Sequence, residues 1–311
     1  MDNLFVAALS ILAGISLRLL GRLPQGADRT VAGVVIQFSA PAVSFLAART
    51  MPLSAEMFLP ASMAWIIFAG GLALFWPLLR SGRISRHTFG CLMLTAAMSN
   101  VIFIGLPMIE AFFGRELVYV AFLCDSPGTS MVLALPGVLL AAHLANSDQG
   151  SGQGIGAGAR VWLSLRRVLG FPPFQALLLG LALRSVALPD WLLTGVAHIG
   201  ATLVPLSLFS VGLGLVFRLP HGSGRPLALG LAYKLALAPA LMWLVAVFLF
   251  GNHGPVAQVT VFEAAMPPMV LGGILATENG LDPELAALMV GVGTPLGFLT
   301  LPVWHWLLAG M

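Results

Sequence analysis

Charged residues are scarce in this chain and make up only 9% of its 311 residues, against roughly a quarter in a typical soluble domain. Hydrophobic residues make up 59%, and the mean hydropathy is +0.97. This balance excludes an ordinary water-soluble domain and indicates that lipid surrounds most of the chain. Because one spanning helix needs about 20 apolar residues, we expect about ten spans and no separate soluble domain.

Residues that carry chemistry are also rare. The two cysteines, Cys91 and Cys124, lie in apolar stretches and lack the spacing of a metal site, so we expect packing roles and no disulfide. No Gly-x-Gly-Asp pair, Gly-x-Ser-Gly motif or His/Cys/carboxylate cluster occurs. The sequence therefore predicts no enzyme, no metal and no resident cofactor. The basic residues lie in short loops, so we expect no nucleic acid partner.

Apolar runs, separated by charged, glycine or proline clusters, predict the spans. They lie near 3–20, 30–48, 57–79, 88–113, 116–143, 171–188, 191–217, 226–250, 255–277 and 284–308. A polar, glycine-rich stretch from Asn146 to Arg160 falls halfway along the chain and is typical of a linker. We therefore expect a first five-helix repeat over 1–145, a cytoplasmic linker over 146–165 and a second five-helix repeat over 166–311.

Basic residues alternate between the two ends of the predicted spans. One side collects twelve of the 15 basic residues, and the other has only Arg49, Arg115 and Arg184. The twelve are Arg18, Arg22, Arg29, Arg80, Arg83, Arg86, Arg160, Arg166, Arg167, Arg218, Arg225 and Lys234. Since cytoplasmic loops are enriched in Lys and Arg, loops after odd-numbered helices are predicted to be cytoplasmic. We expect a multi-pass protein of a bacterial inner membrane with both termini on the periplasmic side.

The two halves of the chain share short matches in the same order. Gly14–Arg18 in the first predicted span matches Gly180–Arg184 in the sixth, and Pro41 corresponds to Pro205 at nearly the same offset. The fifth and tenth spans each carry two prolines at similar separation. Since five spans separate the copies, the repeats are predicted to be inverted.

Helices 4 and 9 each place proline and glycine near the middle of the membrane. Helix 4 carries Asn100, Gly105 and Pro107, and helix 9 carries Pro267 and Pro268. Freed backbone groups in hydrocarbon are costly unless they line a protein cavity or bind a ligand. We expect an all-α fold in which broken helices 4 and 9 cross at a substrate site formed by these five residues, although ordinary proline kinks are the alternative.

Few polar side chains are available inside the predicted spans. Asp125 and Glu263 are candidates for carrying a coupling ion, with Thr294 as a weaker one, because ionisable groups at this depth are expensive. Proton and sodium coupling both stay open. Ser207 is a secondary candidate for substrate contact, and Lys234 is expected to extend its ammonium to the cytoplasmic surface.

These segments together resemble the auxin efflux carrier family, in its malonate-permease-like bacterial branch. The resemblance is carried by Gly14, Pro41, the segment 100–107, Pro205 to Gly212 and Glu263 to Pro268, in this order across nearly the whole chain. It implies a crossover fold like that of bile-acid sodium symporters and carboxylate transport by an elevator-type motion. Plant auxin carriers have Asn-Pro-Asn-x-Tyr in helix 4, which is absent here, so an auxin-like substrate does not follow.

The sequence thus predicts a secondary active transporter of a small organic anion, such as a malonate- or malate-like carboxylate. With no arginine at the midplane, half-helix N-termini, backbone N–H groups and Asn100 are expected to hold the anion. The alternatives are a symporter-like carrier of another solute and an uncoupled channel. The expected partners are the anion and the lipid bilayer, and a homodimer stays open.

Overall fold

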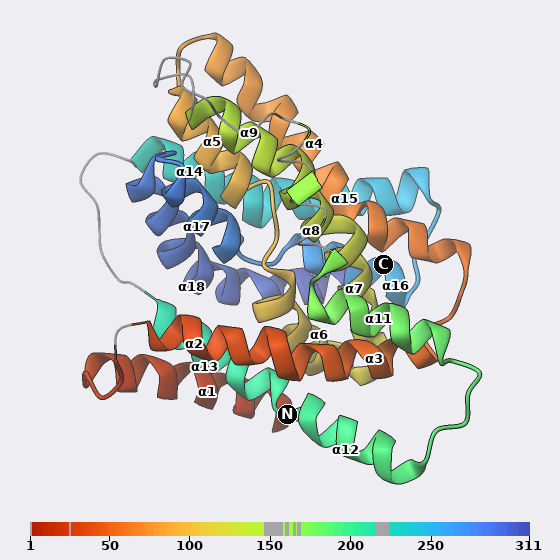
Figure 1. Cartoon of the computed structure of the whole chain (residues 1–311). Helices are drawn as coiled ribbons and strands as arrows, with labels where there is room; N and C mark the ends of the chain where they lie inside the picture. The colour runs from red at the N-terminus through yellow and green to blue at the C-terminus, as the bar shows by residue number, and fades with distance from the viewer. Residues whose placement is uncertain are drawn as a thin grey trace. The chain divides into compact units, whose positions relative to one another are not determined.

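The computed structural model in Figure 1 describes residues 2–24, 26–145, 169–215 and 224–311, together with positions 158, 162, 163 and 166. Its regular structure is helical, apart from one isolated antiparallel bridge between Ser99 and Pro268. The predicted linker lies outside the described residues, except for three single positions. Three of the basic residues used to predict the topology also lie outside them: Arg160, Arg167 and Arg218.

The chain forms two compact units, and each takes segments from both halves of the sequence. The first comprises Met1–Ala55, Ile102–Phe122 and Leu169–Leu215, and the second comprises Glu56–Val101, Leu123–Val168 and Val216–Met311. Helices from the two halves of the sequence thus pack against one another within each unit, and the two five-helix repeats stay a prediction.

The first unit is built from helices joined by short turns. Its elements are α1 (Asp2–Leu19), α2 (Ala27–Val34), the π-helical turn η1 (Val35–Ser39), α3 (Ala40–Thr50), α6 (Leu106–Phe112), the 3-10 turn η4 (Arg115–Leu117), α11 (Pro172–Ala182), α12 (Asp190–Ala201) and α13 (Leu203–Gly214). Helix α7 (Val118–Cys124) begins in this unit and ends in the second.

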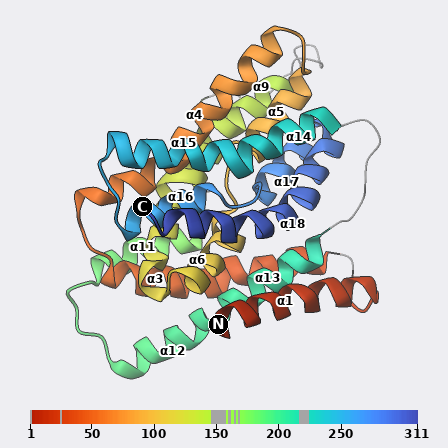
Figure 2. The same cartoon turned by 180° about the vertical axis from the view of Figure 1, so that it is seen from behind.

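Two helix pairs in the first unit pack in the same close manner, and Figures 1 and 2 show α1 beside α13. A methyl group on Gly14 of α1 would lie 2.4 Å from the carbonyl oxygen of Phe209 in α13. A methyl group on Gly180 of α11 would lie 2.5 Å from that of Phe45 in α3. Only glycine allows backbones to approach this closely.

Arginines join the C-terminal ends of the same helix pairs. Arg18 donates hydrogen bonds to the carbonyls of Leu213 and Leu215 at the end of α13. Arg49 donates to the carbonyl of Leu183, just after α11, and to a second carbonyl three residues further on. A cation is favourable where a helix leaves its last carbonyls unpaired. In each pair the two helices therefore run parallel.

The second unit contains the remaining elements. They are η2 (Ala55–Met57) at its start, α4 (Phe58–Arg80), α5 (Arg86–Thr95), η5 (Asp125–Thr129), α8 (Ser130–Val132), η6 (Leu133–Gly137), α9 (Val138–Ala145), α14 (Gly224–Ala232), η7 (Tyr233–Leu237), α15 (Ala238–Leu244), η8 (Val245–Leu249), α16 (Pro255–Ala264), α17 (Val270–Glu278) and α18 (Pro283–Leu308). The π-helical turn η3 (Val101–Gly105) leads from this unit into the first. Figure 2 shows α14 and α15 as one long, bent helix.

Among the described residues, six helices are long and apolar enough to cross a membrane. They cover Ala27–Thr50, Ala55–Arg80, Arg115–Leu144, Asp190–Gly214, Gly224–Leu249 and Pro283–Leu308. The spans predicted near 3–20 and 171–188 correspond to shorter apolar helices, and those near 88–113 and 255–277 are each divided into two pieces. The chain thus has the architecture of an all-helical, multi-pass membrane protein.

Five of the prolines inside the spans lie in or just after wider turns rather than at full breaks. A π-helical turn contains Pro127 and Pro136, and one ends two residues before each of Pro41, Pro107 and Pro239. Proline lacks an N–H and its ring collides with the carbonyl four residues earlier, so an extra residue in the turn relieves the clash.

Candidate substrate site at two interrupted helices

Two of the predicted spans are interrupted by non-helical segments that lie in the second unit. Helix α5 ends at Thr95 and helical structure resumes at Val101, while α16 ends at Ala264 and α17 begins at Val270. The second interruption contains the predicted proline pair. The first comes earlier than the sequence suggested, because a π-helical turn accommodates the proline that was expected to break the helix.

The two interruptions are hydrogen-bonded to each other. The backbone N–H of Asn100 donates to the carbonyl of Pro267 at 3.1 Å, and the N–H of Met269 donates to that of Thr95 at 3.3 Å. Between these bonds lies the Ser99–Pro268 bridge. Since proline has no N–H, Met269 offers the first donor after the proline pair. The exchange satisfies backbone groups that would otherwise be unpaired in an apolar interior.

Glycines let neighbouring helices reach this crossing. A methyl group on Gly272, at the start of α17, would lie 1.8 Å from the carbonyl oxygen of Leu94 in α5. Methyl groups on Gly293 and Gly297 of α18 would lie 2.7 and 2.3 Å from the rings of the proline pair. No side chain fits at these three positions, so the crossing is tightly enclosed.

Lys234 lies at this crossing, which corrects the prediction that its side chain extends to the cytoplasmic surface. It is fully buried in the π-helical turn η7, and its Nζ donates to Ser99 Oγ at 2.6 Å and to the carbonyl of Ala264 at 2.9 Å. It therefore links both interruptions and caps the C-terminal end of α16, where a cation is favourable. The preceding Tyr233 donates its hydroxyl to Ile67 of α4 and fixes the turn.

Two carboxylates belong to the same cluster. Glu263, in the last turn of α16, is fully buried, and neither carboxylate oxygen has a hydrogen-bond partner among the described residues. It interacts electrostatically with Asp125 and Lys234. Asp125, the first residue of η5, is 5% exposed and accepts a hydrogen bond from Ser130 at 3.1 Å. The adjacent Ser126 hydroxyl is buried without a partner in the described structure.

Asn100 offers an unused donor at the crossing. Its side chain is 3% exposed, and the amide nitrogen has no partner within the part of the chain that the structure describes. Leaving such a group unpaired costs about 1–3 kcal/mol. The Asn100 amide and the Lys234 ammonium are therefore two buried donors at the crossing, and the amide is available to a ligand.

The other predicted site residues lie at different places. Thr294 is buried in α18, next to the glycine that contacts the crossing. Gly105 and Pro107 follow the first interruption, at the end of η3 and in the first turn of α6. Ser207 lies in α13 of the first unit and donates to its own helix, to the carbonyl of Leu203 at 2.6 Å. That bond is the common role of serine in membrane helices.

Sequence reasoning missed Lys234 as a member of the site, although a signal was present. It is the only lysine in the chain, and it lies inside an otherwise apolar run. An ionisable residue at such a position is a functional candidate by default. Its position near one end of the predicted span made snorkelling equally compatible with the pattern.

No group of three or more His, Cys, Asp or Glu residues suited to a metal ion occurs within the described ranges. Cys91 and Cys124 are both free, buried thiols. Their burial agrees with the packing role expected from the sequence.

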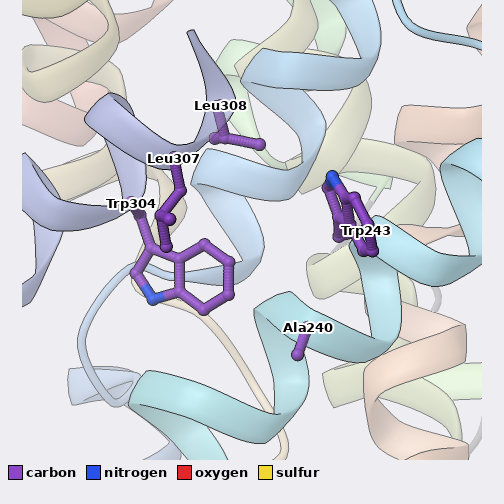
Figure 3. Close-up of a pocket in the computed structure, with 5 residues that line it drawn as sticks. All are labelled: Ala240, Trp243, Trp304, Leu307 and Leu308. Atoms are coloured by element: carbon purple, nitrogen blue, oxygen red, sulfur yellow. The ribbon is translucent and has the colours of Figure 1, made fainter. Parts of the chain in front are cut away.

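Two cavities lie away from the crossing. Figure 3 shows a cavity of about 240 Å³ in the second unit, lined by apolar carbon of α15 and α18. Trp304 on its wall directs its indole N–H to the carbonyl of Leu235 at 2.8 Å, so it presents no free donor. In the first unit, a cavity of about 280 Å³ contains the exposed Arg115–Glu110 ion pair at 2.6 Å. Neither cavity contains the unpaired buried groups.

Comparison with known proteins places these features in a functional class. A family profile described as "Membrane transport protein" matches residues 160–305. A protein of Methanothermobacter thermautotrophicus named as an uncharacterized transporter is 31% identical over 303 residues, which cover 94% of this chain and 93% of the relative. An uncharacterized transporter of Methanocaldococcus jannaschii is 23% identical over 327 residues, with 99% and 98% covered.

The helical, multi-pass architecture and these matches define a membrane transport protein. Within that class, the chain belongs to the auxin efflux carrier family.

Proposed function

We propose that this protein is a secondary active transporter of small organic anions of the malonate and malate class. In this proposal, ten spans form an inverted five-plus-five repeat in a bacterial inner membrane, and broken helices 4 and 9 cross at the substrate site. The observation that carries the substrate class is the pair of buried donors at the crossing, the Asn100 amide and the Lys234 ammonium.

Donor chemistry supports a carboxylate as the ligand. An ammonium has three N–H donors, and Lys234 uses two of them on Ser99 and Ala264. The remaining donor and the free Asn100 amide can both bond a carboxylate, and bonds between charged partners are about twice as strong as neutral ones. In this proposal the ammonium adds to the half-helix N-termini, backbone N–H groups and Asn100 that the sequence suggested would hold the anion.

The inverted repeat is supported by the packing of the first unit. Gly14 and Gly180, which correspond in the two halves, approach Phe209 and Phe45, respectively. Each phenylalanine lies four residues after one of the two corresponding prolines, Pro205 and Pro41. In the proposed repeat, α1 therefore corresponds to α11 and α13 corresponds to α3, so the two helix pairs are equivalent. The helices within each pair run parallel. This fits the topology predicted from the arginines, in which spans 1 and 7 cross the membrane in one direction and spans 2 and 6 cross it in the other.

An elevator-type motion is supported by how the chain divides. The crossing, the buried carboxylates and the lysine all belong to the second unit, whereas α1, α3, α11 and α13 form the body of the first. A site held within one compact unit can be carried across the membrane by movement of that unit as a body.

The test is uptake of a labelled carboxylate panel, malonate and malate included, into liposomes containing the purified protein. Accumulation of one acid above protein-free liposomes under an imposed proton or sodium gradient is the expected result. Folded protein that accumulates none of the acids under either gradient would remove the carboxylate assignment and favour a different solute or a channel.

A further inference from the structure

We propose that Lys234 is a tethered cation in the place where a coupling metal ion would bind, and that the ion moved with the substrate anion is a proton on Glu263. This inference rests on the proposed transport function and specifies the ion that drives the transport. It rests on the position of the ammonium, the unpaired carboxylate and the charge of the cluster.

The oxygen atoms at the crossing are of the kind that hold a coupling cation. In transporters with broken helices, unwound backbone carbonyls and the C-terminal ends of half-helices coordinate sodium or protons. Here the carbonyl of Ala264, at the end of α16, and the hydroxyl of Ser99, in the first interruption, both accept from Lys234 Nζ. A sodium ion sharing these two oxygens would meet a covalently attached positive charge within about 3 Å. The residues present therefore do not fit sodium.

The Glu263 carboxylate lacks what a buried anion needs. It is fully buried, and neither oxygen accepts a hydrogen bond from the described residues, Lys234 Nζ included. A buried carboxylate without hydrogen bonds is unstable as an anion, and a bound proton removes the charge without requiring further space. Asp125, in contrast, has a hydroxyl donor from Ser130. The proton therefore belongs on Glu263.

The charge of the cluster ties this proton to the substrate. With both carboxylates ionised, Asp125, Glu263 and Lys234 carry two negative charges and one positive charge, which opposes entry of an anion. With Glu263 protonated, the cluster is neutral and the Lys234 ammonium is available to the anion. Protonation and anion binding therefore favour each other, and by linkage the coupling is reciprocal.

Other titratable groups near Glu263 do not change this balance. The buried thiol of Cys124, at the end of α7, interacts electrostatically with both carboxylates. On α18, the His305 ring packs against Phe262, the residue before Glu263, with ring centroids 6.3 Å apart. On η7, Tyr233 directs its hydroxyl to α4. Asp125 and Lys234 are the charged groups that act on Glu263.

The first measurement uses wild-type protein in liposomes at zero membrane potential, set with potassium and valinomycin, in sodium-free buffer. Exchange of labelled for unlabelled acid is measured alongside, because exchange needs no ion gradient and tests the proposed transport by itself. We expect uptake driven by an outside-acid gradient. The accumulation ratio should rise about tenfold for each pH unit of the gradient, since a tenfold ratio corresponds to about 1.4 kcal/mol. Active exchange combined with accumulation that requires a sodium gradient would overturn the inference, and absence of exchange would overturn the proposed function with it.

The second measurement compares Glu263→Gln with Glu278→Gln, an exposed glutamate at the end of α17 on the same broken helix. Glu263→Gln is expected to lose accumulation driven by the pH gradient relative to the exchange measured in the same liposomes, whereas Glu278→Gln keeps the wild-type ratio of accumulation to exchange. Proton-driven accumulation that persists in Glu263→Gln would overturn the assignment of the proton.

A third measurement does not depend on any variant. The affinity of purified wild-type protein for the transported acid, measured in sodium-free buffers at pH values above the acid's own pKa, should fall as the pH rises, because the anion binds the form in which Glu263 is protonated. An affinity that does not change with pH, or binding that requires sodium, would contradict the inference.

Discussion

At the residue scale, the crossing buries hydrogen-bond donors and hydrogen-bond acceptors in one cluster. The Asn100 amide and the Lys234 ammonium offer donors, whereas the Glu263 carboxylate offers only acceptors. Each is expensive to bury alone, and in our proposal one anion and one proton neutralise the site that they form.

Replacing Asn100 tests whether its free donor contacts substrate. Asn100→Ala is expected to raise the KM for the transported acid about 10- to 100-fold, since a hydrogen bond to a charged group contributes about 1.5–3 kcal/mol. Asn279→Ala is the matched control, because that amide donates to its own helix at the carbonyl of Leu275. Initial uptake rates over a range of acid concentrations measure both. An unchanged KM in Asn100→Ala would exclude the amide from the site.

Asn100, Asp125 and Glu263 could be predicted from the sequence, because a polar side chain in a long apolar run needs a reason to be there. Lys234 could not be placed in the same way. A lysine several residues from a span's end can reach either water or the interior, and only the wide turn at Tyr233–Leu237 directs it inward.

At the element scale, the two interruptions stabilise each other through backbone hydrogen bonds. The break in helix 9 was visible because consecutive prolines remove two donors. The position of the break in helix 4 was not, because Ala96–Asn100 contains no strong helix breaker and is held open by pairing with residues far along the chain. A local pattern contains no information about such a partner.

The closest approach at the crossing gives a prediction about folding. Gly272→Ala is expected to prevent the native packing of α17 on α5, because the new methyl group would lie 1.8 Å from a backbone carbonyl oxygen. Gly195→Ala in α12 has open space around it and is expected to keep or slightly raise stability. The thermal midpoints of the purified variants measure this. A Gly272→Ala protein as stable as wild type would contradict the crossing geometry.

The corresponding glycines of the two halves give a second prediction. Gly14→Ala and Gly180→Ala should lower the thermal midpoint by similar amounts, because each methyl group would meet a carbonyl oxygen at about the same distance, 2.4 and 2.5 Å. Gly33→Ala in α2, with nothing near it, is the control. If only one of the two variants were destabilised, the proposed repeat symmetry of these helix pairs would be wrong.

At the scale of the whole molecule, the two compact units interleave segments from both halves of the chain. The sequence indicated many spans and a repeat, because hydropathy and short matches are local signals. It did not indicate which spans pack together, since that depends on contacts between helices far apart in the chain. The proposed elevator motion belongs to this scale.

Alternating access can be followed with a single cysteine near the crossing. In protein carrying Cys91→Ala and Cys124→Ala, the Thr294→Cys variant is expected to react with a membrane-impermeant thiol reagent from either side, and saturating acid should slow the reaction. Ser81→Cys, on the exposed turn after α4, should react from one side only. Reaction of Thr294→Cys from a single side would contradict movement of the site across the membrane.

The most direct test of the central claim is counterflow in liposomes loaded with unlabelled carboxylate, diluted into a trace of the labelled acid without any ion gradient. A carrier with one anion site that faces each side in turn predicts a transient accumulation of label above equilibrium, followed by slow decay. Label that enters no faster than in protein-free liposomes, or that equilibrates rapidly without exceeding equilibrium, would contradict the account.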